Sequence, residues 1–214
     1  MNVIAVNGGP RKDWNTGTML KSALAGAESV GARTKLVHLY DLTYKGCTSC
    51  FSCKRKGNDC GGLCAMRDDL RAVLEEVLEG DVLLLGSPVY FGDVTGEMRS
   101  FLERLLFPSA SYDEFGTSTF PRQVSCGFIF TMNCPEEFVK TVHYDVLLEN
   151  HALVLGILKG RTEVLTSHEG YQFADYSAMN AAMFDVEAKT RRRAERFPVD
   201  CQKAFEMGAR LSAG

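Results

Sequence analysis

Short apolar runs and amphipathic segments alternate five times along this chain, and this alternation constrains the fold more than any other feature. Each apolar run has the length of a buried strand, and each intervening segment repeats its apolar residues every three or four positions, as a helix does. The apolar runs lie at 3–6, 34–39, 82–86, 124–131 and 163–167, and the helical patterns at 16–27, 70–78, 98–106 and 136–148. Strands joined through helices form a parallel sheet with right-handed crossovers. The sequence therefore predicts an α/β fold, a doubly wound five-stranded parallel sheet with helices on both faces.

The five repeats occupy only part of the 214 residues. Residues 1–169 contain all of them, so we predict one α/β domain there and a C-terminal extension, 170–214, packed on the same domain. We expect Thr16 and Thr18 to cap the first helix with their hydroxyls. The basic cluster 191–193 in the extension is interpreted as a solvated helix face.

The charge balance excludes several classes of function. Lys and Arg number 24 against 27 Asp and Glu, which gives a net charge of −3, and no basic block occurs. Nucleic acid is therefore not expected as a partner. No apolar run reaches the length of a membrane span, and the first ten residues lack the pattern of a signal peptide, so we expect a cytoplasmic protein without a membrane partner.

Three loops follow predicted strands and should meet at one edge of the sheet, because ligands of open α/β sheets bind at the carboxyl ends of the strands. These loops are 7–18, 87–93 and 131–136. The first combines glycines, hydroxyls and an amide with the start of a helix, which suits a phosphate group. It lacks the Walker and Rossmann glycine spacings, which disfavours ATP or NAD at this loop, and a plain strand-to-helix turn is the alternative.

The second and third loops carry groups that suit a planar aromatic ligand. Tyr90 and Phe91 stand between Pro88 and Gly92, where a flat ring could stack, although they could equally cap the core. The third loop offers Thr131 and Asn133 as polar contacts, but an Asn before Cys-Pro is also a common turn former.

The three loops together resemble the flavodoxin-like NAD(P)H-dependent FMN reductase family. The segment Asn7-Gly8-Gly9-Pro10-Arg11, followed by Asn15-Thr16, is similar to that family's phosphate loop, and Gly86-Ser87-Pro88-Val89-Tyr90 to its isoalloxazine loop. Gly9 stands where the family usually has Ser, so the backbone amides of Gly8 and Gly9 and neighbouring side chains would have to replace a hydroxyl donor. The cysteines between 47 and 64, with Asp68-Asp69 behind them, also resemble the iron–sulfur flavoprotein branch and its clusterless relatives.

The resemblance implies a flavodoxin-like FMN-binding domain over 1–169 and an oxidoreductase in which NAD(P)H delivers hydride to FMN. Electrons would then pass to a quinone, a flavin or another small-molecule or protein acceptor, and the protein would be a homodimer or homotetramer. The flavin carries the reactivity, so we assign no catalytic side chain. The residues expected to contact FMN are Gly9, Pro10, Arg11, Asn15, Thr16, Gly17, Thr18, Pro88, Val89, Tyr90, Phe91, Gly92, Asp93, Thr131 and Asn133.

The cysteine segment leaves three alternatives open. Cys47, Cys50 and Cys53 have the spacing of three ligands of a [4Fe–4S] cluster, and the fourth would be Cys60 by its short spacing or Cys64 by its place ahead of Asp-Asp. The favoured hypothesis is a loop of reduced thiols without a cluster, and a zinc site is the third alternative. Two further classes of function follow from this segment: a flavin electron-transfer protein, with or without iron and sulfur, that has no nicotinamide site, and a metal protein whose core merely displays the loop.

Overall fold

A computed structural model describes residues 1–58, 60–114 and 116–213. Five strands form one parallel sheet in the order β2-β1-β3-β4-β5, as the alternation of apolar runs predicted. The strands are β1 Asn2–Asn7, β2 Arg33–His38, β3 Val82–Pro88, β4 Val124–Thr131 and β5 Lys159–Ser167. The strand order reverses direction between β1 and β3, and this switch point opens a crevice at the carboxyl edge of the sheet.

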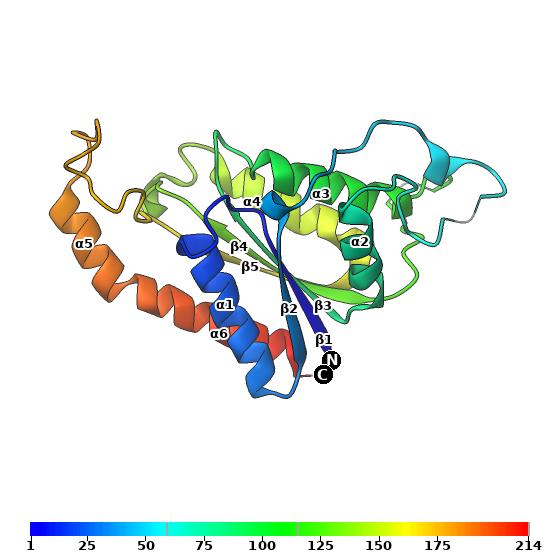
Figure 1. The fold of residues 1–214 in the computed structure, drawn as a ribbon, viewed down its shortest axis with the longest axis horizontal. Coiled ribbons are helices and arrows are strands. Elements are labelled where there is room, and N and C mark those ends of the chain that lie inside the picture. The colour runs from blue at the N-terminus through cyan, green and yellow to red at the C-terminus, as the bar shows by residue number, and fades with distance from the viewer. Residues whose placement is uncertain (59, 115, 214) are drawn as a thin grey trace.

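Helices cover both faces of the sheet (Figure 1). The helices are α1 Asn15–Ser29, α2 Leu70–Glu79, α3 Gly96–Leu106, α4 Tyr144–Leu155, α5 Val186–Glu195 and α6 Phe197–Ser212. Side chains of α2, α3 and α4 share one core layer with alternate residues of the strands, and α1 and α6 form the layer on the opposite face. The prediction of a doubly wound sheet is therefore confirmed.

Helix α6 completes the second face by packing very closely on α1. A Cβ atom on Gly26 would lie 1.9 Å from the carbonyl oxygen of Phe205, and one on Gly208 would lie 1.8 Å from that of Ala23. The two glycines let the helix backbones touch, so α6 belongs to the packed core. Part of the predicted extension thus packs on the same domain, while the boundary at residue 169 stays a prediction.

Two predicted helical features are wrong. The pattern 136–148 is not one helix: Glu136–Phe138 is a short 3₁₀ turn, His143 takes a left-handed conformation with φ 59°, and α4 begins only at Tyr144. Thr16 and Thr18 do not cap α1, because the capping position is Trp14, whose side chain makes no capping hydrogen bond. The first turn of α1 consequently keeps its backbone amides uncapped by any side chain.

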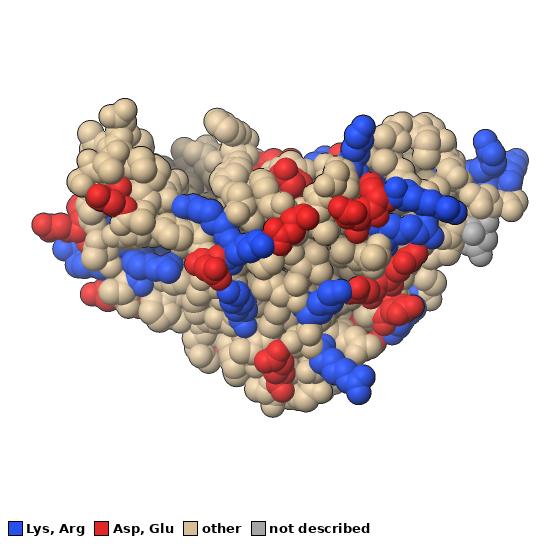
Figure 2. All heavy atoms as spheres, in the orientation of Figure 1, with Lys and Arg blue, Asp and Glu red and all other residues tan. Residues whose placement is uncertain are grey.

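The surface carries both signs of charge intermixed, and the face drawn in Figure 2 shows no continuous basic patch. Within the described ranges, no helix combines the length and the apolar character that crossing a bilayer requires.

Candidate functional site

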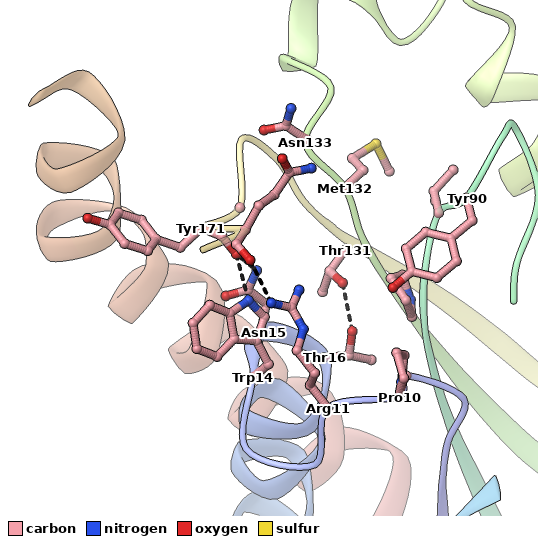
Figure 3. Close-up of a pocket in the computed structure, with 15 residues that line it drawn as sticks. Pro10, Arg11, Trp14, Asn15, Thr16, Tyr90, Thr131, Met132, Asn133 and Tyr171 are labelled. Atoms are coloured by element: carbon pink, nitrogen blue, oxygen red, sulfur yellow. Dashed lines mark hydrogen bonds between the residues drawn. The ribbon is translucent and has the colours of Figure 1, made fainter. Parts of the chain in front are cut away.

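One pocket lies at the carboxyl edge of the sheet, where the loops after β1, β3 and β4 converge with the segment after β5 (Figure 3). The space between its lining residues amounts to about 550 Å³ and includes open solvent. The lining residues are Gly9, Pro10, Arg11, Trp14, Asn15, Thr16, Pro88, Val89, Tyr90, Thr131, Met132, Asn133, Gly170, Tyr171 and Gln172.

The first end of the pocket is built from the N-terminus of α1. Within the described part of the chain, the backbone amides of Asn15, Thr16 and Gly17 have no protein acceptor, because the first intrahelical acceptor, the carbonyl of Trp14, is taken by Thr18. Uncapped amides and the positive end of the helix dipole favour an anion at this position.

Three side-chain donors surround these amides and all reach backbone oxygens of the segment after β5. Arg11 donates to the carbonyl of Gln172 at 2.6 Å, while the Trp14 indole and the Asn15 amide donate to that of Tyr171 at 2.7 and 2.9 Å (Figure 3). The Arg11 guanidinium also stacks 4.4 Å from the centre of the Trp14 ring. The carbonyl oxygens therefore hold the three donors in place beside the free amides of α1, at a position that suits the oxygen atoms of an anion.

The second end of the pocket is formed by the loops after β3 and β4. Tyr90 and Asp93 exchange two backbone hydrogen bonds, and Phe91 and Gly92 between them both have positive φ, which makes a tight turn. The two loops are joined because Val89 donates its amide to the carbonyl of Thr131. This turn presents Pro88, Val89 and Tyr90 to the pocket, as an aromatic ligand would require.

A buried hydrogen bond connects the two ends. The hydroxyls of Thr16 and Thr131 lie 2.7 Å apart, and each residue is at most 5% exposed. The start of α1 is thereby fixed to the end of β4, across the switch point of the sheet.

The structure brings most of the predicted contact residues together, with five exceptions. Gly17, Thr18, Phe91, Gly92 and Asp93 do not line the pocket. Gly17 has a packing role instead, since a Cβ there would lie 1.9 Å from the carbonyl oxygen of Lys12. Phe91 is fully exposed, so it does not cap the core either.

The amides of Gly8 and Gly9, expected to contact a phosphate, are used inside the protein. Gly8 donates to the carbonyl of Gly86 at 2.8 Å, and Gly9 donates to the Asn7 side chain at 2.8 Å. Sequence reasoning missed Trp14 and the segment 170–172 as pocket residues, and Met132 of the third loop was not among the residues expected to contact FMN.

The basic cluster 191–193 is not the solvated face that was expected, because only Arg191 is exposed. Arg192 pairs with Asp200 at 2.9 Å, and Arg193 donates to the Asn15 side chain at 2.8 Å. Helix α5 is thus attached to the pocket.

Four of the five clustered cysteines line a second, much smaller cavity against α3: Cys47, Cys50, Cys53 and Cys64. The Cys60 thiol lies outside it, 3.8 Å from the carbonyl oxygen of Cys53. Burial raises the pKa of the Cys53 thiol. Among the described residues, no three Cys, His, Asp or Glu side chains converge as metal ligands. Whether these thiols hold a cluster, with Cys60 or Cys64 as the fourth ligand, stays a prediction.

Arg104 on α3 anchors this cysteine loop to the protein core. The residue is 1% exposed, and its guanidinium donates to the Cys64 sulfur at 2.9 Å, to the carbonyl of Lys45 at 2.8 Å, and to both carboxylate oxygens of Asp68 at 2.8 and 3.1 Å. The guanidinium holds the pKa of Asp68 below its usual value. One buried cation thus ties both ends of the loop to the core.

Comparison with known proteins decides the family. The family model described as NADPH-dependent FMN reductase matches residues 1–119. The chain belongs to this family. An iron–sulfur flavoprotein of Methanocaldococcus jannaschii is 34% identical over 104 residues, and one of Archaeoglobus fulgidus is 36% identical over 106 residues. The matches cover 49% and 50% of this chain and 51% and 46% of those proteins, so the chain spans about half the length of the curated relatives it matches.

Solved structures confirm the flavodoxin-like fold. An NAD(P)H:quinone oxidoreductase from Methanothermobacter marburgensis superposes with a TM-score of 0.70 at 15% identity, over 99% of this chain and 96% of that one. An azoreductase from Bacillus anthracis gives 0.64 at 12% identity, over 98% and 99% of the two chains.

The family supports FMN as the ligand, and the pocket fits that molecule. The uncapped amides of α1, with Arg11 and Asn15 beside them, suit a phosphate dianion. Pro88, Tyr90 and Met132 offer flat or apolar surface for a planar ring.

Proposed function

We propose that this protein is an FMN-dependent oxidoreductase that takes hydride from NAD(P)H and passes electrons to a quinone, a flavin or another acceptor. The observation that carries the proposal is the convergence of the uncapped start of α1 with the aromatic turn after β3 at the β1/β3 switch point. Doubly wound sheets of this strand order bind FMN at that position.

The protein's own residues would act by binding and orienting. The backbone amides of Asn15 and Thr16, which line the pocket, would hold the phosphate, and Arg11 would neutralise part of its charge. Pro88 and Tyr90 would fix the plane of the ring and keep water from one side of it. Bound FMN would supply the hydride and electron chemistry, so no side chain is required as an acid or base.

The test is oxidation of NADH and of NADPH by the FMN-loaded protein, measured at 340 nm under anaerobic conditions with a quinone as the acceptor. Saturable oxidation that depends on both substrates supports the proposal. If the loaded protein oxidises neither dinucleotide faster than free FMN does, the proposed activity is wrong.

A second candidate is an iron–sulfur flavin electron carrier without a nicotinamide site. Two observations favour it: four thiols share one cavity, and the curated relatives are named iron–sulfur flavoproteins. The lack of converging ligands among the described residues counts against it. Iron and sulfide analysis after anaerobic purification separates the two candidates, since the carrier requires both elements in stoichiometric amounts.

We further propose a homodimer or homotetramer in the cytoplasm, where thiols stay reduced and NAD(P)H is supplied. Exposed apolar side chains support a subunit contact on α4, where Leu153 is 77% exposed and Val146 and Val154 are also exposed. Light scattering coupled to gel filtration tests the assembly, and replacement of Leu153 by Asp should lower the measured mass if α4 forms the contact.

A further inference from the structure

Two cations on α5 each bind the side-chain oxygen of an asparagine that lines the pocket. Lys189 donates to Oδ1 of Asn133 at 2.5 Å, and Arg193 donates to Oδ1 of Asn15 at 2.8 Å. Lys189 and Arg193 are four residues apart on one helix, so they lie on the same face, one turn from each other. Neither cation lines the pocket itself, whereas both asparagines do.

A side-chain amide can turn over, exchanging its oxygen acceptor for its NH₂ donors. A cation accepts no hydrogen bond, so a cation beside the amide selects the orientation in which the oxygen faces it. The NH₂ group of Asn15 is thereby directed to the carbonyl oxygen of Tyr171, a pocket residue, at 2.9 Å. In the described part of the chain, the NH₂ group of Asn133 has no protein acceptor and stays available to a ligand.

The surroundings of Lys189 are built to hold it in this place. Lys189 is only 8% exposed, and its ammonium also donates to the carbonyl oxygens of Glu169 and Gly170 at 3.3 and 3.4 Å. The ammonium lies 5.1 Å from the centre of the Phe184 ring. Burial lowers the pKa of Lys189, and its three oxygen acceptors offset the cost of burying the ammonium.

Arg193 is held in a comparable way. Its guanidinium stacks 4.0 Å from the centre of the Phe197 ring at the start of α6. Because α6 is packed against α1, this stacking fixes the cation relative to the N-terminus of α1, where Asn15 stands.

We propose that Lys189 and Arg193 are positioning residues of the flavin site: Lys189 turns the Asn133 amide so that its NH₂ group faces an oxygen-rich ligand, and Arg193 turns the Asn15 amide so that its NH₂ group holds the Tyr171 carbonyl at the pocket wall. The proposal rests on FMN binding in this pocket. Asn15 stands at the anion end and Asn133 at the end of β4, beside the ring surfaces. Loss of Arg193 should therefore weaken FMN binding, while loss of Lys189 should change the absorption spectrum and midpoint potential of bound flavin.

The decisive experiment is a double-mutant cycle on FMN affinity, measured by quenching of FMN fluorescence. Arg193→Met should raise the Kd about tenfold, as expected for one misoriented charge-assisted contact. In an Asn15→Ala background the same replacement should have no further effect, because Arg193 acts only through that amide. Arg193→Lys should recover part of the affinity.

Arg191→Met is the matched control, since it removes the same charge from an exposed position of the same helix. If Arg191→Met weakens FMN as much as Arg193→Met does, long-range charge rather than amide orientation is responsible, and the proposal is wrong. An equal loss from Arg193→Met in both backgrounds overturns it as well.

A corresponding cycle tests the second pair. Lys189→Met should shift the flavin absorption maximum and midpoint potential in the wild-type background and leave them unchanged in Asn133→Ala. Unshifted values in Lys189→Met overturn that half of the proposal. Thermal unfolding of each protein without FMN controls for a general loss of folding. If the wild-type protein binds no FMN at all, it is the proposed function that fails, which is a distinguishable result.

Discussion

Replacement of Arg104 by Met should be among the most destabilising single changes on α3. The guanidinium is nearly inaccessible to water and forms hydrogen bonds with Asp68, Cys64 and Lys45. Removing one partner of a buried ion pair costs about 3–5 kcal/mol, because the other charge is left uncompensated. The Asp68 side chain keeps 18% of its exposure, so some hydration remains and we expect the lower end, about 3 kcal/mol.

The assay is denaturant unfolding at pH 7, followed by circular dichroism. In a chain of this size, the expected loss also lowers the Tm by roughly 6–12 °C. Arg99→Met on the same helix is the control: its side chain is 57% exposed and its ion-pair distances to Asp93 and Glu103 are both 3.8 Å. Exposed pairs of this kind contribute about 0–1 kcal/mol. A loss below about 1 kcal/mol for Arg104→Met would refute the argument for a buried anchor.

The pH dependence gives a second check on the same contact. Hydrogen bonds from Arg104 lower the pKa of Asp68, so the carboxylate contributes stability above its ordinary pKa of 3.8 that is lost as the pH falls toward the lower native value. The stability difference between the wild type and Arg104→Met should be constant near neutral pH and should shrink below about pH 4. A difference that grows on acidification contradicts the assigned pairing.

Three further predictions concern the pocket and the thiols. Gly17→Ala should abolish FMN binding, because the added Cβ would lie 1.9 Å from the Lys12 carbonyl oxygen and displace the loop before α1. Fluorescence titration measures this, and wild-type affinity would contradict it. Thr16→Ala should lower the free energy of unfolding by about 1 kcal/mol, because it removes the 2.7 Å hydrogen bond to the Thr131 hydroxyl. A thermal melt indistinguishable from that of the wild type would contradict this prediction. Burial raises the pKa of Cys126 to about 12, so its thiol should resist iodoacetamide at pH 8 in the folded protein, whereas the exposed Cys50 should react. Peptide mass spectrometry measures the labelling of each cysteine. Equal labelling of the two would count against the fold around β4.

The sheet could be predicted from the sequence because its signals are local. Runs such as Val82–Leu85 are buried on both faces and therefore uniformly apolar, which identifies a central parallel strand without knowledge of its neighbours. The helix before β5 was misplaced for the opposite reason. Its start depends on the left-handed conformation of His143, which the residue type does not predict.

The pocket likewise has a part that local sequence predicts and a part that it does not. Loops after β1 and β3 carry glycines, hydroxyls and aromatics whose chemistry indicates a ligand, and the rule for open sheets places them at one edge. The segment Gly170–Gln172 was missed because it contributes backbone carbonyls, which any residue type can supply. Its contacts with Trp14 and Asn15 join residues that are about 156 positions apart. Likewise, nothing local to Arg193 indicates that it reaches Asn15.

The central claim is that the β1/β3 switch point of this chain binds FMN, and an equilibrium titration tests it most directly. Purified protein freed of bound flavin should quench FMN fluorescence to a single saturating level at one FMN per chain, and the complex should keep its flavin absorbance through gel filtration. Riboflavin, which lacks the phosphate, should bind far more weakly, because the uncapped amides of α1 would lose their acceptor. Equal affinity for riboflavin and FMN, or no saturable quenching by FMN, would contradict the account.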